Sequence, residues 1–163
     1  MSDAAKVALV TGGNRGIGLA IAKELAAQGV KVIIGHRSGS APTGFESVLI
    51  DVSDTKSVDS AVSEIDAKYG GVDILVANAG ITKDGLVMRM SDDDFESVVN
   101  TNLTGAFRVA RATSKNMMKK REGRIIFIGS VVGLLGSAGQ VNYSATKSGL
   151  DGMARSFARE LGS

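Results

Sequence analysis

Five short apolar runs are spread along the chain, and none of them alternates with polar residues. Apolar runs of this length, bounded by polar or glycine-containing segments, are typical of strands buried on both faces of a parallel sheet. The pattern therefore predicts five parallel strands, at Val7–Val10, Val30–Ile34, Val48–Ile50, Ile74–Val76 and Ile125–Ile128.

Longer segments with a helical period separate most of these runs. Ser53 or Asp54 before the second segment and Ser91 before the third are suitable N-caps, and Gly70 is a suitable C-terminal stop. The alternation of strand and helix predicts an α/β fold, a Rossmann-type doubly wound parallel sheet. Residues 36–47 have no helical period, so we expect a bare loop to connect the second strand to the third. The predicted helices are Gly16–Gln28, Asp54–Tyr69, Ser91–Lys120 and Gln140–Leu161.

The two longest predicted helices have faces suited to pairing with another subunit. The helix over 91–120 has an apolar stripe with Asn102 as its polar member, and the helix over 140–161 has a face of small residues. Small residues let a neighbouring helix approach closely, so we expect both helices to pair with their copies in a homo-oligomer. The stripe consists of Phe95, Val98, Val99, Asn102, Leu103, Ala106, Val109 and Ala110, and the small face of Ala145, Gly149, Gly152 and Ser156.

Composition indicates one globular domain over residues 1–163, because 44% of the residues are hydrophobic and 22% are charged. The 21 Gly residues, against 1 Pro, gather mainly where the chain must turn or approach another group closely. The absence of Cys and the single His, His36, exclude a zinc site, a disulfide framework and a cysteine nucleophile.

Charge and hydropathy exclude further classes of protein. A net charge of +2, scattered basic residues and 4% aromatic residues argue against nucleic-acid binding by base stacking. Residues 125–146 carry no charge, yet glycines and polar side chains interrupt them, so we expect a buried strand and a loop rather than a membrane span. Residues 1–6 lack the features of a secretory signal, so the cytoplasm is the expected compartment.

The segment Thr11-Gly-Gly-Asn-Arg-Gly-Ile-Gly18 follows the first strand and opens the first helix. In this context backbone N–H groups and the helix dipole bind the pyrophosphate of a dinucleotide. A nucleoside-triphosphate loop is excluded, because Leu19-Ala20 stands where that loop requires Lys followed by Ser or Thr. The alternative is a glycine-rich turn with a structural role.

His36 and Arg37 end the second strand, where an NAD site carries an acidic residue for the ribose 2′-hydroxyl. Together with Arg15 they supply positive charge suited to a 2′-phosphate, which a guanidinium can bind through two hydrogen bonds. The sequence therefore predicts NADP(H) rather than NAD(H). The alternative is two solvated surface arginines and a loop histidine.

Tyr143, Lys147 and Ser130 are candidate catalytic residues. Tyr143 and Lys147 lie one helical turn apart, and a nearby ammonium lowers the pKa of a phenol so that it can serve as a general acid or base. A tyrosine at the edge of the core beside a surface lysine is the alternative. Ser130 follows the fifth strand, but it does not match the GxSxG pattern of a hydrolase, and no histidine follows it to act as a base.

Taken in order, these motifs resemble the short-chain dehydrogenase/reductase family over the whole chain. The matching positions are Thr11-Gly12 with Gly16-Ile17-Gly18, Asn78-Ala79-Gly80, Asn102, Ser130, Tyr143 and Lys147. Longer stretches, such as NLTGAFRVA at 102–110 and GRIIFIGSVVG at 123–133, are similar to the 3-oxoacyl-[acyl-carrier-protein] reductases of fatty-acid biosynthesis. The stretch GHRSGSAP at 35–42 is similar to their actinobacterial branch.

The resemblance implies an NADPH-dependent oxidoreductase that reduces a 3-oxoacyl thioester carried by acyl carrier protein. Tyr143 would protonate the ketone oxygen, and Lys147 would bind the nicotinamide ribose and lower the pKa of Tyr143. Ser130 would hydrogen-bond the substrate oxygen, and Asn102 would hold a water in the proton relay. The cofactor contacts would be Gly12, Asn14, Arg15, Gly16, Ile17, Gly18, Arg37, Asp51, Val52, Asn78, Ala79, Gly80, Tyr143 and Lys147.

Two alternatives remain open, a reductase of another ketone or a sugar and an inactive chain that binds nucleotide. Members of the family continue with further strands and a substrate-covering segment, so we expect a partial chain in which the strand at 125–128 is an unpaired apolar edge. A basic cluster is a candidate dock for an acidic carrier protein, or simply a solvated helix end. It consists of Lys115, Lys119, Lys120, Arg121 and Arg124.

Overall fold

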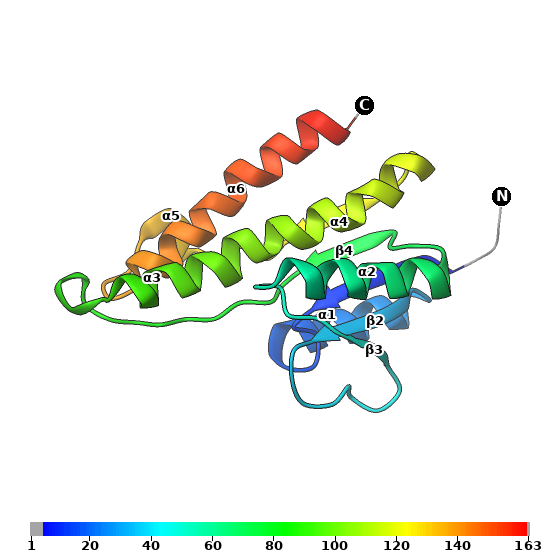
Figure 1. Ribbon diagram of the computed structural model, residues 1–163, viewed down its shortest axis with the longest axis horizontal. Helices are drawn as coiled ribbons and strands as arrows, with labels where there is room; N and C mark the ends of the chain where they lie inside the picture. The colour runs from blue at the N-terminus through cyan, green and yellow to red at the C-terminus, as the bar shows by residue number, and fades with distance from the viewer. Residues whose placement is uncertain (1–4, 163) are drawn as a thin grey trace.

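The computed structural model describes residues 5–162 and contains a five-stranded sheet in which every paired strand is parallel. The strand order is β3-β2-β1-β4-β5 (Figure 1). This topology confirms the predicted Rossmann-type sheet, and each of the five predicted strands is present. They are β1 (Val7–Thr11), β2 (Lys31–His36), β3 (Glu46–Leu49), β4 (Ile74–Ala77) and β5 (Arg124–Phe127).

Helices connect every pair of consecutive strands except β2 and β3, which a loop joins as predicted. The carboxylate of Asp54 caps α2 by accepting from the backbone N–H groups of Lys56 and Ser57 at 3.3 and 3.1 Å. The hydroxyl of Ser91 caps α3 by accepting from the N–H of Asp94 at 3.1 Å. The helices are α1 (Gly16–Ala27), α2 (Thr55–Tyr69), η1 (Val87–Arg89), α3 (Asp92–Val99), η2 (Asn100–Thr104), α4 (Gly105–Lys120), α5 (Val132–Leu135) and α6 (Val141–Leu161).

The helix predicted over residues 91–120 contains a π-helical segment, η2, between α3 and α4. The N–H of Gly105 donates to the carbonyl of Asn100 rather than to that of Thr101, so the helix is one residue wider at this turn. This turn changes the register between α3 and α4, and Phe95, predicted on the apolar stripe, is 38% exposed. An amphipathic pattern with a uniform helical period could not predict this change.

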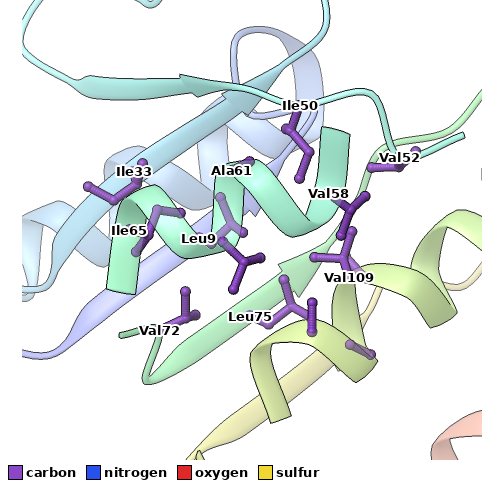
Figure 2. Packing of buried hydrophobic residues seen from close by; sticks show 14 of the residues in the cluster. Leu9, Ile33, Ile50, Val52, Val58, Ala61, Ile65, Val72, Leu75 and Val109 are labelled. Carbon is purple, nitrogen blue, oxygen red and sulfur yellow. The ribbon is translucent and has the colours of Figure 1, made fainter. Parts of the chain in front are cut away.

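The two faces of the sheet pack against different helices. On one face, Ala22 of α1 packs with Val10, Val32 and Ile34 of the central strands. On the other face α2 and α4 cover the sheet, while α6 packs against α3 and η2 (Figure 1). Figure 2 shows side chains of α2 and α4 gathered around Leu9, and burial of each Val or Ile among them contributes about 1.5–3 kcal/mol.

The outer strands are less buried than their apolar sequences predicted. Leu49 of β3 is 67% exposed and Ile126 of β5 is 44% exposed. This corrects the expectation that all five strands are buried on both faces, because β3 and β5 are the edges of the sheet and have a neighbour on one side only. For β5 it agrees with the predicted unpaired apolar edge.

The uncharged segment 125–146 forms several short elements. It contains most of β5, a loop, the four-residue helix α5, a second loop and the start of α6. Among residues 5–162, no helix is long and apolar enough to cross a membrane.

Glu46, at the start of β3, binds three side chains. The ammonium groups of Lys31 and Lys68 each lie 2.5 Å from its carboxylate, and the hydroxyl of Tyr69 donates to it. The hydrogen bonds from Lys31, Lys68 and Tyr69 lower the pKa of Glu46 to about 2. This group therefore ties β2, β3 and α2 together at the open edge of the sheet.

We expect the Glu46→Gln variant to lose a stabilising contribution that depends on pH. A carboxyl with a lowered pKa stabilises the fold above its unfolded-state pKa of about 4.5 and loses that effect as the pH falls through about 2. The difference in urea midpoint between wild type and variant should therefore be largest near neutral pH and shrink below pH 4.5. A difference that stays constant over this range would contradict the assignment.

Candidate active site

The predicted site residues lie on the loops that follow the strands and on the helices packed against those loops. From β1 the chain adds β2 and then β3 toward one edge of the sheet. It then returns to the other side of β1 and adds β4 and β5 toward the opposite edge, so the strand order reverses between β1 and β4. Open α/β sheets bind their ligands in the crevice beyond the carboxyl ends of the strands at such a point. The fold therefore places the glycine loop after β1 beside Asn78-Ala79-Gly80 after β4.

The glycine loop forms a cradle that side chains would fill. Gly12 and Gly16 have φ angles of +64° and +55°, a conformation that other residues rarely adopt. A Cβ on Gly18 would lie 2.5 Å from the carbonyl oxygen of Gly12. The N–H groups of residues 16–18 at the start of α1 have no intrahelical partners, and within residues 5–162 no side chain caps this helix. The cradle thus presents backbone donors and a helix N-terminus, as an anionic group requires.

Asn78 and Thr11 hold the two loops of this cradle together. The side-chain amide of Asn78 donates to the carbonyls of Thr11 and Gly12 at 3.0 and 3.2 Å. The hydroxyl of Thr11 accepts from the N–H groups of Asn78 and Ala79, both at 3.1 Å. Sequence reasoning assigned no role to Thr11; a hydroxyl residue between the buried strand and the first glycine is the feature that could have indicated one.

Positive charge lies beside the end of β2. Arg15 and Arg37 are exposed, and the side chain of Asn14 reaches the carbonyl of Ser38 at 3.5 Å, so the glycine loop lies next to Arg37. His36 differs from its prediction as a phosphate-facing cation, because it ends β2 and is only 7% exposed. Among the described residues its Nδ1 has no hydrogen-bond partner. The two arginines therefore supply the accessible positive charge here.

Asp51 and Val52 follow β3 at the carboxyl ends of the strands, where the glycine loop also lies. The carboxylate of Asp51 accepts from the hydroxyl and the N–H of Ser53 at 2.6 and 2.9 Å. The hydrogen bond from the Ser53 hydroxyl lowers the pKa of Asp51, with smaller contributions from its backbone N–H and the charges of Arg37 and Arg108. The side chain of Val52 points into the hydrophobic core (Figure 2), so only its backbone faces the loop.

Lys147 and Tyr143 lie on α6 with Lys147 beneath the loop that follows β5. The ammonium of Lys147 lies 5.5 Å from the centre of the Tyr143 ring and donates to the carbonyl of Ile128 at 2.6 Å. Burial lowers the pKa of Lys147, because removal from water disfavours the charged form. The structure thus places a buried ammonium against the half-buried ring of Tyr143.

Ser130 lies in the loop that Lys147 holds. Its hydroxyl accepts from the N–H of Val132 at 3.3 Å. The following helix, α5, packs directly on α6, because a Cβ on Gly133 would lie 2.9 Å from the carbonyl carbon of Lys147. The structure thus brings the Ser130 loop against the part of α6 that carries Lys147.

Asn102 lies in the π-helical segment and is 2% exposed. Its side-chain oxygen accepts from the N–H of Ile81 at 2.8 Å, and its amide donates to the carbonyl of Ile81 at 2.9 Å. The amide also lies 3.5 Å from the hydroxyl of Thr146, the residue before Lys147. Asn102 therefore joins the loop after β4 to α6, and the whole predicted catalytic set belongs to one connected region.

Comparison with known proteins agrees with this geometry. The family model for short chain dehydrogenase matches residues 6–163. The 3-oxoacyl-[acyl-carrier-protein] reductase MabA of Mycobacterium avium is 55% identical over 153 residues, which cover 94% of this chain and 60% of that protein. MabA of Mycobacterium tuberculosis H37Rv is 54% identical, with 94% of this chain and 62% of that protein covered.

A further relative lies outside the mycobacteria. The 3-oxoacyl-[acyl-carrier-protein] reductase FabG of Escherichia coli K12 is 47% identical over 171 residues, which cover 100% of this chain and 70% of that protein. The chain thus spans about three fifths of the length of the mycobacterial relatives. The extent of the family match, together with this identity, shows that the chain belongs to the short-chain dehydrogenase family.

Proposed function

We propose that this chain carries the cofactor site and the catalytic residues of an NADPH-dependent 3-oxoacyl-[acyl-carrier-protein] reductase. The observation that carries the proposal is the packing of Tyr143, Lys147 and the Ser130 loop into one region. That region lies at the carboxyl ends of the strands, as does the glycine cradle with its free backbone N–H donors. The names of the mycobacterial and enterobacterial relatives support the choice of a 3-oxoacyl thioester as substrate.

The residues of the cradle fit a dinucleotide. The unpaired N–H groups of residues 16–18 suit its pyrophosphate, and Arg15 with Arg37 suits the 2′-phosphate of NADP(H). Asp51 and the backbone of Val52 are the proposed adenine contacts, and Asn78-Ala79-Gly80 are those on the adenosine ribose side. When bound, the reduced nicotinamide supplies a hydride.

The catalytic residues then supply and position a proton. The hydroxyl of Tyr143 protonates the ketone oxygen, and the ammonium of Lys147 stabilises the phenolate that remains. Lys147 has three N–H donors, of which the carbonyl of Ile128 takes one, so the others are free for the ribose hydroxyls. We assign to Ser130 a hydrogen bond to the substrate oxygen, and to Asn102 a water that resupplies the proton.

The basic cluster at the end of α4 is the proposed dock for the acidic carrier protein. Lys115, Lys119 and Arg121 are exposed, whereas Lys120 forms an ion pair with Asp73 at 2.7 Å. Arg124, at the start of β5, is also exposed, so four of the five cations of this cluster stay accessible to an acidic partner. We also propose that the helices over 91–120 and 140–161 pair with their copies in a homo-oligomer; the exposed Phe95 and Phe107 suit such an interface.

Turnover by the full chain tests the proposed function. NADPH oxidation is followed with acetoacetyl-CoA and, separately, with a panel of small ketones and sugars. We expect oxidation with the acyl thioester at a rate well above that with the other compounds. Faster oxidation with a small ketone would support a different reductase, and NADPH binding without any oxidation would support a chain that only binds nucleotide.

A further inference from the structure

Arg108 makes four hydrogen bonds that no sequence motif indicated. Its Nε donates to the hydroxyl of Thr55 at 3.1 Å. A terminal nitrogen donates to the carbonyl of Val52 at 3.2 Å, and to the carbonyl and the side-chain oxygen of Asn100 at 3.3 and 2.8 Å. One half-buried guanidinium thus binds the loop after β3 and the first residue of the π-helical segment.

The loop after β3 and the π-helical segment also contact each other directly. A Cβ on Gly105 would lie 2.8 Å from Cγ2 of Val52, so the loop lies against the end of the π-helical segment. The amide of Asn100 lies 3.5 Å from the carbonyl of Ser53. The junction therefore joins residues 51–55 to both ends of the segment that contains Asn102.

The carbonyl oxygen of Asn100 accepts two hydrogen bonds. In the wider π-helical turn its carbonyl accepts from the N–H of Gly105, and the guanidinium of Arg108 adds a second, charged donor to the same oxygen. Hydrogen bonds from a charged donor are stronger than neutral ones. Arg108 thus stabilises the turn whose geometry sets the position of Asn102.

We propose that Arg108 is a positioning residue that couples the adenine side of the cofactor site to the segment carrying Asn102. The inference rests on the proposed function, which places the adenine at Asp51 and Val52. A ligand that orders the loop at residues 51–55 also orders the π-helical segment through the guanidinium. Without the guanidinium, a ligand that orders the loop no longer orders the π-helical segment.

Binding of 2′,5′-ADP, the adenosine half of NADP, to the full chain tests this coupling. In the wild type, the ligand should bind and slow hydrogen exchange of the backbone amides in residues 100–105. In Arg108→Met we expect binding about tenfold weaker and, at saturating ligand, no slowing of exchange in that segment. Arg108→Lys keeps the charge but not the fork of donors, so it should restore only part of both effects.

Arg111→Met is the matched control, because Arg111 is exposed on the same helix and stacks on Phe107 at 5.1 Å. It should bind 2′,5′-ADP and protect residues 100–105 like the wild type. If Arg108→Met fails to fold, Thr55→Val, which removes one contact, should still weaken both effects. Unchanged protection in folded Arg108→Met or Thr55→Val overturns the inference, whereas a wild type that binds no 2′,5′-ADP overturns the proposed cofactor site itself.

Discussion

Replacement of Tyr143 by Phe is expected to slow ketone reduction by about 10²–10⁴-fold, the usual contribution of a general acid. The substitution removes the one hydroxyl proposed to protonate the ketone oxygen. It keeps the ring that lies 5.5 Å from the ammonium of Lys147. NADPH should therefore bind with nearly unchanged affinity while the rate of reduction falls. A fluorescence titration measures the affinity, and stopped-flow kinetics on the same preparation measure the rate.

Tyr69→Phe makes the same chemical change away from the proposed site and serves as the control. Tyr69 binds the carboxylate of Glu46 at the edge of the sheet. Its loss should affect stability more than the rate of reduction. Full activity of Tyr143→Phe would sink the proposed mechanism, and an equal loss of rate in both variants would point to a general weakening of the fold.

Replacement of Arg37 by Asp is expected to reverse the preference between the two nicotinamide cofactors. A hydrogen bond to a charged group contributes about 1.5–3 kcal/mol, so its loss weakens NADPH binding by about 10–150-fold. The new carboxylate repels the 2′-phosphate, yet it can accept from the 2′-hydroxyl of NADH. Titration of the variant with NADPH and with NADH gives the two dissociation constants directly.

Lys23→Asp provides the matching change of charge on an exposed part of α1. It alters the net charge of the chain as much as Arg37→Asp does, but it lies outside the proposed cofactor site. We expect its preference for NADPH to stay that of the wild type. NADPH binding that is equally strong in wild type and Arg37→Asp would mean that the 2′-phosphate lies elsewhere.

Periodicity predicted the central strands and the long helices of this fold well because most of them bury an apolar face against the core. The runs at 7–10 and 74–76 are central strands with neighbours on both sides, and their burial follows from their sequence. The run at 48–50 looks the same, yet Leu49 is 67% exposed because β3 is an edge. Strand order depends on contacts distant in sequence, so a local apolar run cannot distinguish an edge from a centre.

The local sequence pattern could not predict the π-helical segment or the contacts of the polar side chains, for a related reason. Asn102 interrupts an apolar stripe, which marked it as unusual, but the wider turn is bound by Arg108 and packs against Val52 at Gly105, and both contacts come from the tertiary fold. His36 seemed accessible beside Arg37, whereas the structure buries it at the end of β2. In both cases neighbours brought in by the tertiary fold decide the environment of the side chain.

The bonds between Asn78 and Thr11 bridge 67 positions of the chain. The cradle cannot exist until β1 has paired with β4, and β4 follows β2, β3 and α2 along the chain. A nucleotide that needs this cradle therefore recognises the assembled sheet and not its parts. Such a ligand favours the folded state by mass action, by about 2.7 kcal/mol at a hundred times its dissociation constant. In a cell, the supply of nucleotide would then help to determine how much of the chain stays folded.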